Sequence, residues 1–125
     1  MTRRVVLPTL TLACALLGGS AAMAAPQDWV SVAVDQVGHW SWQFDSNPEA
    51  AISGAINRCA ARCKTAFTVR ARCIAYAESK VTGYWFGAGH GEGHGDARFM
   101  ALERCKGSAP AQTCRVIKEQ CEGEH

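Results

Sequence analysis

The sequence predicts an α+β domain built of two similar ββαβ halves, with mostly antiparallel sheet, two helices and three disulfides. Three observations predict this fold. The chain contains an internal duplication, and six of its seven cysteines lie beyond residue 24. Several segments alternate apolar and polar residues with the period of a β-strand, and two others have apolar residues at helical spacing. We expect this single domain at residues 25–125, behind a signal peptide at residues 1–24.

Residues 1–24 have the three parts of a secretory signal peptide. Arg3 and Arg4 are positively charged, residues 5–17 are mostly apolar, and residues 22–24 form an Ala-Met-Ala cleavage site. The apolar stretch is shorter than the roughly 20 residues that a membrane-spanning helix requires. We therefore expect a periplasmic or secreted protein with no membrane span.

The charge balance argues against nucleic acid as a partner. The chain contains 13 Lys and Arg against 11 Asp and Glu, and its net charge of +2 comes from Arg3 and Arg4 in the signal peptide. The mature part is therefore neutral. A protein that binds nucleic acid or anionic lipid through general electrostatics needs a basic excess.

Two stretches of the mature chain match each other in the same order, which indicates a duplicated unit. Each half contains a Gly-aromatic-Trp motif, an Ala-rich segment that ends in Arg-Cys, and a Cys followed by a basic residue. These features lie at residues 38–40, 55–59 and 63–64 and again at residues 83–85, 101–105 and 114–115. The halves are placed at about residues 29–73 and 73–121.

The elements of the first half follow from periodicity and from capping residues. Residues 30–34 and 40–44 alternate apolar with polar side chains, which predicts two strands joined by a hairpin turn at residues 35–38. The sequence Ser-Asn-Pro-Glu at residues 46–49 is typical of a helix start. Residues 65–73 are again rich in β-formers. The predicted apolar stripe of the helix consists of Ile52, Ala55, Ile56 and Cys59.

The second half repeats this order. Residues 73–77 and 83–86 are predicted strands, and residues 114–121 are a third. Asp96 is a predicted helix cap, and the glycine-rich residues 87–95 before it are expected to form a loop. The helix that follows has an apolar stripe of Ala97, Ala101, Leu102 and Cys105.

Six cysteines in a small exported domain predict three disulfides. The alternative, a zinc site, is disfavoured because no Cys-x-x-Cys pair occurs and the compartment is expected to be oxidising. The internal symmetry suggests that two bridges each tie a helix end to the next strand, and that the third bridge joins the two halves. The suggested pairs are Cys59–Cys63, Cys105–Cys114 and Cys73–Cys121.

Four short motifs resemble those of a small exported bacterial family, domain of unknown function 4189. They are Trp-Val-Ser-Val-Ala at residues 29–33, Ala-Ile-x-x-Cys at 55–59, Cys-Ile-Ala-Tyr-Ala at 73–77 and Ala-Leu-x-x-Cys at 101–105. The resemblance implies a secreted or periplasmic domain without an established enzymatic activity, and it supplies no catalytic residues. The sequence departs from the family pattern at residues 87–95, where two histidines and an acid replace a plainer turn.

That unusual segment offers candidate metal ligands. His90, Glu92, His94 and Asp96 are spaced by two residues, with glycine between them, so in an extended strand they would point to one side. The imidazoles of His90 and His94 and the carboxylate of Glu92 suit Zn²⁺, Ni²⁺ or Cu²⁺. The alternative is a glycine loop with solvated histidines and no cofactor.

The aromatic residues can be interpreted as part of the hydrophobic core or as a surface that binds a partner. Trp40, Trp42 and Trp85 are the candidates for a surface that contacts another protein. The leading hypothesis for function is a non-enzymatic exported binding module for an unknown envelope or secreted protein, such as an inhibitor or an immunity protein. The first alternative is transition-metal binding, and the second is a hydrolase with an unrecognised site, since no serine lies in a nucleophile-elbow motif.

Overall fold

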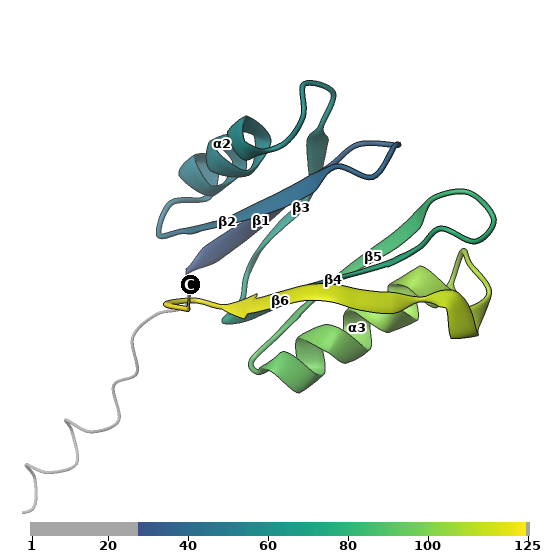
Figure 1. The fold of residues 1–125 in the computed structure, drawn as a ribbon. Helices are drawn as coiled ribbons and strands as arrows, with labels where there is room; N and C mark the ends of the chain where they lie inside the picture. The colour runs from purple at the N-terminus through teal and green to yellow at the C-terminus, as the bar shows by residue number, and fades with distance from the viewer. Residues whose placement is uncertain (1–27, 125) are drawn as a thin grey trace, which may run out of the picture.

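Each half of the domain forms a three-stranded antiparallel sheet covered by one helix (Figure 1). The computed structural model describes residues 28–124, so the expected signal peptide and His125 lie outside the described residues. The strand orders are β2-β1-β3 and β5-β4-β6. The elements are β1 (Trp29–Val34), β2 (Trp40–Asp45), α2 (Pro48–Arg58), β3 (Lys64–Arg70), β4 (Cys73–Ser79), β5 (Trp85–Gly91), α3 (His94–Lys106), a 3₁₀ turn (Ala111–Thr113) and β6 (Arg115–Cys121).

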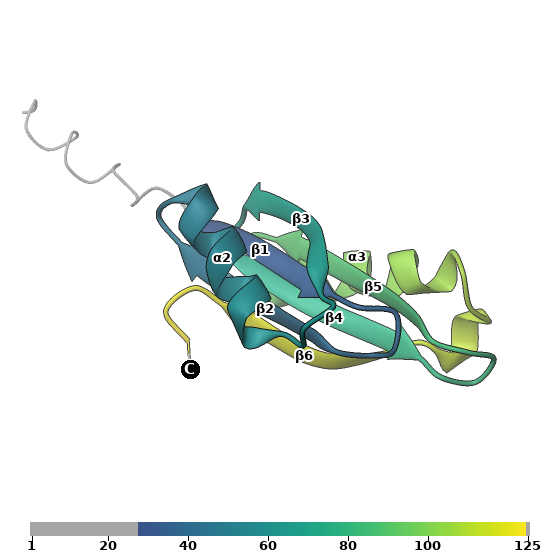
Figure 2. The same ribbon diagram turned by 90° about the horizontal axis from the view of Figure 1, so that it is seen from above.

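The two sheets face each other and the helices lie outside them, which gives four layers in the order α2, first sheet, second sheet, α3 (Figures 1 and 2). The predicted α+β fold of two similar halves is thus confirmed, with the β-structure divided into two separate sheets. The main core lies between the sheets, where alternating strand residues meet. It consists of Val30, Val32, Trp42, Ala71, Ile74, Tyr76 and Ala88.

Helix α2 begins as the sequence predicts. The side chain of Asn47 accepts a hydrogen bond from the backbone N–H of Ala50, and Pro48 occupies the first turn, where a missing N–H costs nothing. The buried face differs from the predicted stripe. Ala51 and Ala55 are the buried residues, whereas Ile56 is 37% exposed. Small side chains face the sheet here because they let the helix approach it closely.

The glycine-rich segment is mainly strand, so the predicted loop at residues 87–95 is wrong. Strand β5 continues to Gly91, and Gly87, Gly89 and Gly91 all face α3. A Cβ atom on Gly89 would lie 2.3 Å from the backbone nitrogen of Ala101, and one on Gly87 would lie 2.3 Å from the carbonyl oxygen of the same residue. The alternating glycines therefore let the helix backbone lie directly on the strand.

Helix α3 begins earlier than predicted. Gly93 is the N-cap and makes no side-chain capping bond, so Asp96 is not the cap. Asp96 lies in the first turn, where its negative charge favours the positive end of the helix dipole. The face toward the sheet consists of Ala97, Ala101 and Cys105, as the apolar stripe predicts.

All three predicted cysteine pairs are bonded in the structure: Cys59–Cys63, Cys73–Cys121 and Cys105–Cys114. The first and third tie the end of a helix to the following strand, as expected. The expected role of Cys73–Cys121 is corrected. Both residues belong to the second sheet, where they are directly opposite each other on β4 and β6, so the bridge does not join the halves.

The halves are joined by packing and by hydrogen bonds instead. Apart from the main core, the indole Nε1 of Trp42 donates to Oε1 of Gln120 at 2.6 Å, which links β2 to β6. At the first described residue, the backbone N–H of Asp28 donates to Oε2 of Glu122 at 2.9 Å. The hairpins β1–β2 and β4–β5 lie at the same end of the molecule (Figure 1).

Candidate binding groove

A groove of about 820 Å³ opens between the two halves at the end where both hairpins lie. The first half contributes the end of β1, the β1–β2 turn and the approach to β3. The second half contributes the start of β5 with the residue before it, and the second residue after α3. The lining residues are Val34, Asp35, Gln36, Val37, Arg62, Lys64, Tyr84, Trp85, Phe86 and Ser108.

Stacked aromatic rings connect the core to the floor of this groove. The ring of Trp40 stacks on Tyr76 with centroids 4.6 Å apart, and Tyr76 stacks on Phe86 at 5.7 Å. Phe86 in turn stacks on Tyr84 at 6.2 Å, and both of these residues line the groove. Because Tyr76, in the middle of the series, is fully buried, the floor of the groove is packed against the core.

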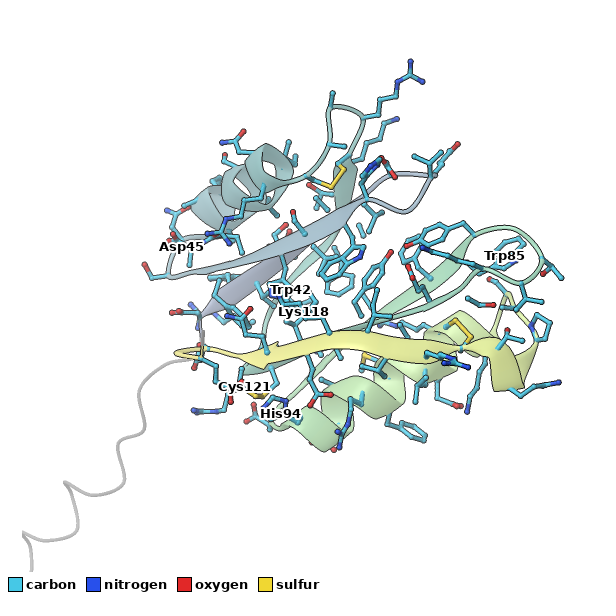
Figure 3. The ribbon with its side chains drawn as sticks, viewed as in Figure 1. Trp42, Asp45, Trp85, His94, Lys118 and Cys121 are labelled. Atoms are coloured by element: carbon cyan, nitrogen blue, oxygen red, sulfur yellow. A yellow bond between two sulfur atoms is a disulfide. The ribbon has the colours of Figure 1, made fainter. Side chains whose placement is uncertain are left out.

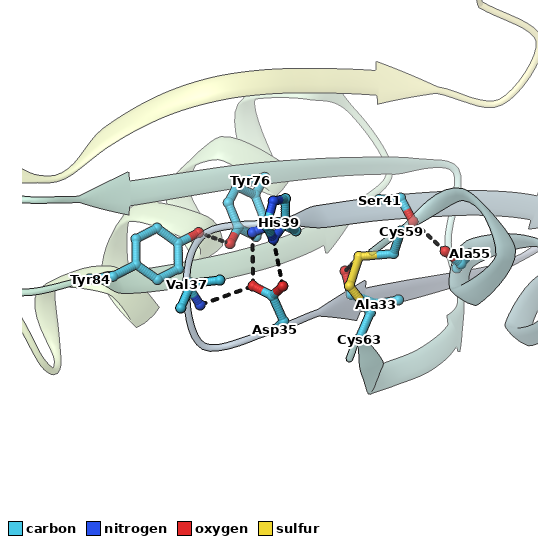
Figure 4. Close-up of a disulfide and its surroundings, with 10 residues drawn as sticks. All are labelled: Ala33, Asp35, Val37, His39, Ser41, Ala55, Cys59, Cys63, Tyr76 and Tyr84. Atoms are coloured by element: carbon cyan, nitrogen blue, oxygen red, sulfur yellow. Dashed lines mark hydrogen bonds and ion pairs between the residues drawn. A yellow bond between two sulfur atoms is a disulfide. The ribbon is translucent and has the colours of Figure 1, made fainter. Parts of the chain in front are cut away.

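Tyr76 and Tyr84 are hydrogen bonded through their hydroxyl groups between the sheets (Figure 4). Burial raises the pKa of Tyr76 far above its ordinary value, and it raises the pKa of Tyr84 to about 12. Both phenols are therefore neutral at physiological pH. Tyr84 offers the groove an aromatic face, and its high pKa makes it a poor base or nucleophile because the phenol stays protonated.

Asp35 fixes the β1–β2 turn that forms one wall. Its Oδ1 accepts hydrogen bonds from the backbone N–H groups of Val37 and His39, both at 2.9 Å, and its Oδ2 lies 2.6 Å from His39 Nδ1 (Figure 4). Burial acts to raise the pKa of Asp35, but the hydrogen bonds from His39 and Val37 outweigh it and the pKa is lowered. The fixed turn presents Val37 with 76% of its surface exposed.

The rim of the groove combines an exposed indole with two cations. Trp85 is 39% exposed, and its Nε1 donates to the carbonyl of Thr82 at 3.3 Å. Arg62 and Lys64 lie on the opposite half, at the entry to β3, and both are exposed. The sequence-based search missed these two residues. No local motif marks them, because the groove exists only where turns of both halves meet.

The three tryptophans predicted as a partner surface have different positions. Trp42 is 5% exposed and is covered by Gln120 and by Lys118, whose Nζ lies 5.8 Å from its ring centroid. Trp40 is half-buried in the aromatic stack. Trp85 lies at the opposite end of the molecule from His94 and Cys121 (Figure 3). Of the three, Trp85 is the one with an exposed ring at the groove.

The predicted metal ligands His90, Glu92 and His94 are not brought together. His90 lies on the inner face of β5, where its ring is 5.9 Å from that of Phe67. Burial lowers the pKa of His90, and the nearby charge of Arg104 lowers it further. Glu92 is exposed between strand and helix, and His94 begins α3. The strand ends between the two histidines, so the spacing of two no longer places them on one side.

His94 lies between two carboxylates instead. Its Nε2 is 3.1 Å from Glu124 Oε2, and its Nδ1 is 2.8 Å from Glu119 Oε1, although this second contact lacks hydrogen-bond geometry. The hydrogen bond with Glu124 and the charges of both acids raise the pKa of His94. Within residues 28–124, one set of three possible ligand atoms lies within 4.8 Å: those of His94, Cys121 and Glu124.

This set is best described as an ion-pair cluster. The sulfur of Cys121 is bonded to Cys73 and is therefore not a thiolate, the form in which cysteine binds metals. His94 must also lose its proton before it can act as a ligand, and the two carboxylates oppose that loss. The cluster connects the start of α3 with β6 and the carboxyl-terminal residues.

Taken together, the fold and the groove define a disulfide-linked, duplicated α+β domain with a cleft between its halves. The chain belongs to the family described as Domain of unknown function (DUF4189), whose model matches residues 29–121. No curated protein and no solved structure matches the chain.

The disulfides bear on where the protein resides. The three disulfides are typical of proteins that mature outside the reducing cytoplasm. Among the described residues, no helix is long and apolar enough to cross a membrane.

Proposed function

We propose that this protein is a non-enzymatic binding module of the periplasm or the extracellular space, and that it holds part of another exported protein in the groove between its halves. One observation carries the proposal. The groove has a rigid aromatic floor, an exposed tryptophan and an exposed valine on its rim, and a volume suited to side chains of a partner. An inhibitor or an immunity protein acts through such a contact.

The two alternatives receive less support from the geometry. The described Ser and Thr hydroxyls that form hydrogen bonds form them with backbone carbonyls or with one another, and not with a base. A hydrolase would need a nucleophile beside a general base. A transition-metal site through His90, Glu92 and His94 would need these three side chains to converge, whereas His90 packs on Phe67.

Site-specific photocrosslinking in the native host tests the proposal. A photoreactive phenylalanine in place of Val37, which lines the groove, is expected to form a discrete crosslink to one exported protein. The matched control carries the same group in place of Phe99, which is 68% exposed on α3 and does not line the groove. Equal crosslinking at both positions would argue against a site in the groove. So would a crosslink from position 37 that persists when Trp85 is replaced by alanine.

A further inference from the structure

Two cations lie on the rim of the groove. Within residues 28–124, Arg62 and Lys64 form no ion pair, whereas Arg98 pairs with Glu119 and Lys106 with Glu103 elsewhere on the surface. Both are exposed and both line the groove. They lie two residues apart at the entry to β3, so their charges reinforce each other at one place on the rim.

Asp35 is the carboxylate that lines the groove, and among the described residues it pairs with neither of these cations. It accepts two backbone N–H groups of its own turn and lies 2.6 Å from His39 Nδ1, so its hydrogen bonds are made within the hairpin. The groove therefore has an apolar aromatic floor with a positive rim. Charge complementarity then requires an occupant that places an anionic group within reach of the rim and an apolar group on the floor.

We infer that the segment held in the groove is a peptide with an apolar side chain beside one or more acidic side chains. This inference rests on the proposed function and specifies its partner. A concave site favours a peptide segment over a flat lipid surface, because apolar side chains can enter the groove and leave water behind. The rim cations would meet the partner's carboxylates, which fixes the register and orientation of the segment.

Selection from a phage-displayed library of random peptides tests this inference with the mature, oxidised protein. We expect the enriched peptides to contain acidic residues next to Leu, Phe, Trp or another large apolar residue. The double variant Arg62→Glu, Lys64→Glu should select peptides with basic residues instead. It should also bind the original peptides more weakly, on the order of tenfold. Both substitutions are at exposed positions, so circular dichroism is expected to show an unchanged fold.

A variant that fills the groove separates this inference from the proposed function. Ser108→Trp adds bulk at an exposed lining position without changing charge. Peptides that lose binding to Ser108→Trp but show no acidic preference would overturn the inference and leave the groove as the binding site. Peptides that bind Ser108→Trp as well as the unmodified protein, or no enrichment at all, would overturn both. Peptide binding that is displaced by anionic vesicles would assign the rim to lipid.

Discussion

His94 and His90 are four residues apart, yet the fold places them in opposite electrostatic surroundings. His94 lies between Glu124 and Glu119, which raise its pKa. His90 lies between the sheets near Arg104, where burial and the neighbouring cation lower its pKa. The pKa values of the two imidazoles are therefore shifted in opposite directions, although the sequence presents the residues as equivalent members of one motif.

The ion pair of His94 with Glu124 has a defined pH window. Because the pKa of His94 is raised, its ion pair contributes fully to the free energy of unfolding below the ordinary pKa of 6.5. This contribution is lost as the pH rises through the raised pKa. The lowered pKa of Glu124 contributes above the ordinary value of 4.5 and is lost as the pH falls through the lowered value. Both contributions are present between these two ordinary values.

The variant Glu124→Gln tests this assignment. Removal of the carboxylate should lower the pKa of His94 toward its ordinary value, because the hydrogen bond with Glu124 is the largest cause of the shift. Titration of the imidazole signals by NMR measures the change. His90 serves as an internal control whose pKa should stay below its ordinary value. A pKa of His94 that is unchanged in the variant would show that Glu124 does not pair with it.

The glycines of β5 illustrate how a sequence pattern can have two meanings. Glycine at every second position predicts either a flexible loop or a strand in close contact with another element, and the sequence alone favoured the loop. The structure shows the second meaning, because Gly87, Gly89 and Gly91 are the positions that α3 covers. The facing helix residues, Ala97 and Ala101, were predicted as buried, and their small size was the available indication of a close approach.

Replacement of Gly89 by alanine should destabilise the domain by about 2–3 kcal/mol, because the added methyl group overlaps the backbone of α3. The Cβ would lie 2.3 Å from Ala101 N and 2.4 Å from Ala97 O. The matched control is Gly95→Ala, a position with nothing within 4 Å, in the first turn of the same helix. The control should be neutral or slightly stabilising. Urea unfolding measures both, and equal stability of the two variants would refute the close packing.

The disulfides should differ in their contribution to stability. Cys73–Cys121 closes a loop with a sequence separation of 48, and Cys59–Cys63 closes one of only 4. Because a disulfide restricts the unfolded chain, replacing both Cys73 and Cys121 by alanine should lower the free energy of unfolding by about 4 kcal/mol. The same change at Cys59 and Cys63 should lower it by about 2 kcal/mol. Denaturant unfolding of the two double variants tests this order. The reverse order would mean that native-state effects, and not loop length, determine their contributions.

At the scale of the whole molecule, the sequence predicted the elements and their duplication but not how the sheets assemble. Alternation shows that one face of β1 is buried, and it cannot show whether that face meets a helix or another sheet. In the structure one face of β1 packs on the second sheet and the other on α2, so both faces are covered. Small residues such as Ser31 and Ala33 on the helix side were the available sign of this arrangement.

The site was predictable only in part, for a related reason. The groove is formed by residues from separate turns of both halves, and local patterns do not show which turns converge. Trp85 was among the predicted partner-surface residues and lies at the groove, whereas Trp42 is covered by Gln120 of β6. Arg62 and Lys64 belong to no local motif. They become candidate site residues only because they line the groove together with Tyr84 and Phe86 of the other half.

The shared core predicts that the two halves unfold together. Val32 is fully buried between the sheets, so Val32→Ala should cost about 2–3 kcal/mol. Because both sheets depend on this core, amide hydrogen exchange should lose protection to the same extent in β1 and in β4. Loss of protection confined to β1, β2 and β3 would show that the halves unfold independently and that the inter-sheet core is not a single cooperative unit.

The central claim is that the groove between the halves is the binding site, and calorimetry with the purified partner identified by crosslinking tests it most directly. The variant Ser108→Trp fills the groove, and Gln112→Trp adds the same bulk at an exposed position outside it. We predict that Ser108→Trp weakens binding by about thirtyfold or more, whereas Gln112→Trp binds as the unmodified protein does. Equal affinity of the two variants for the partner would contradict the assignment of the groove as the binding site.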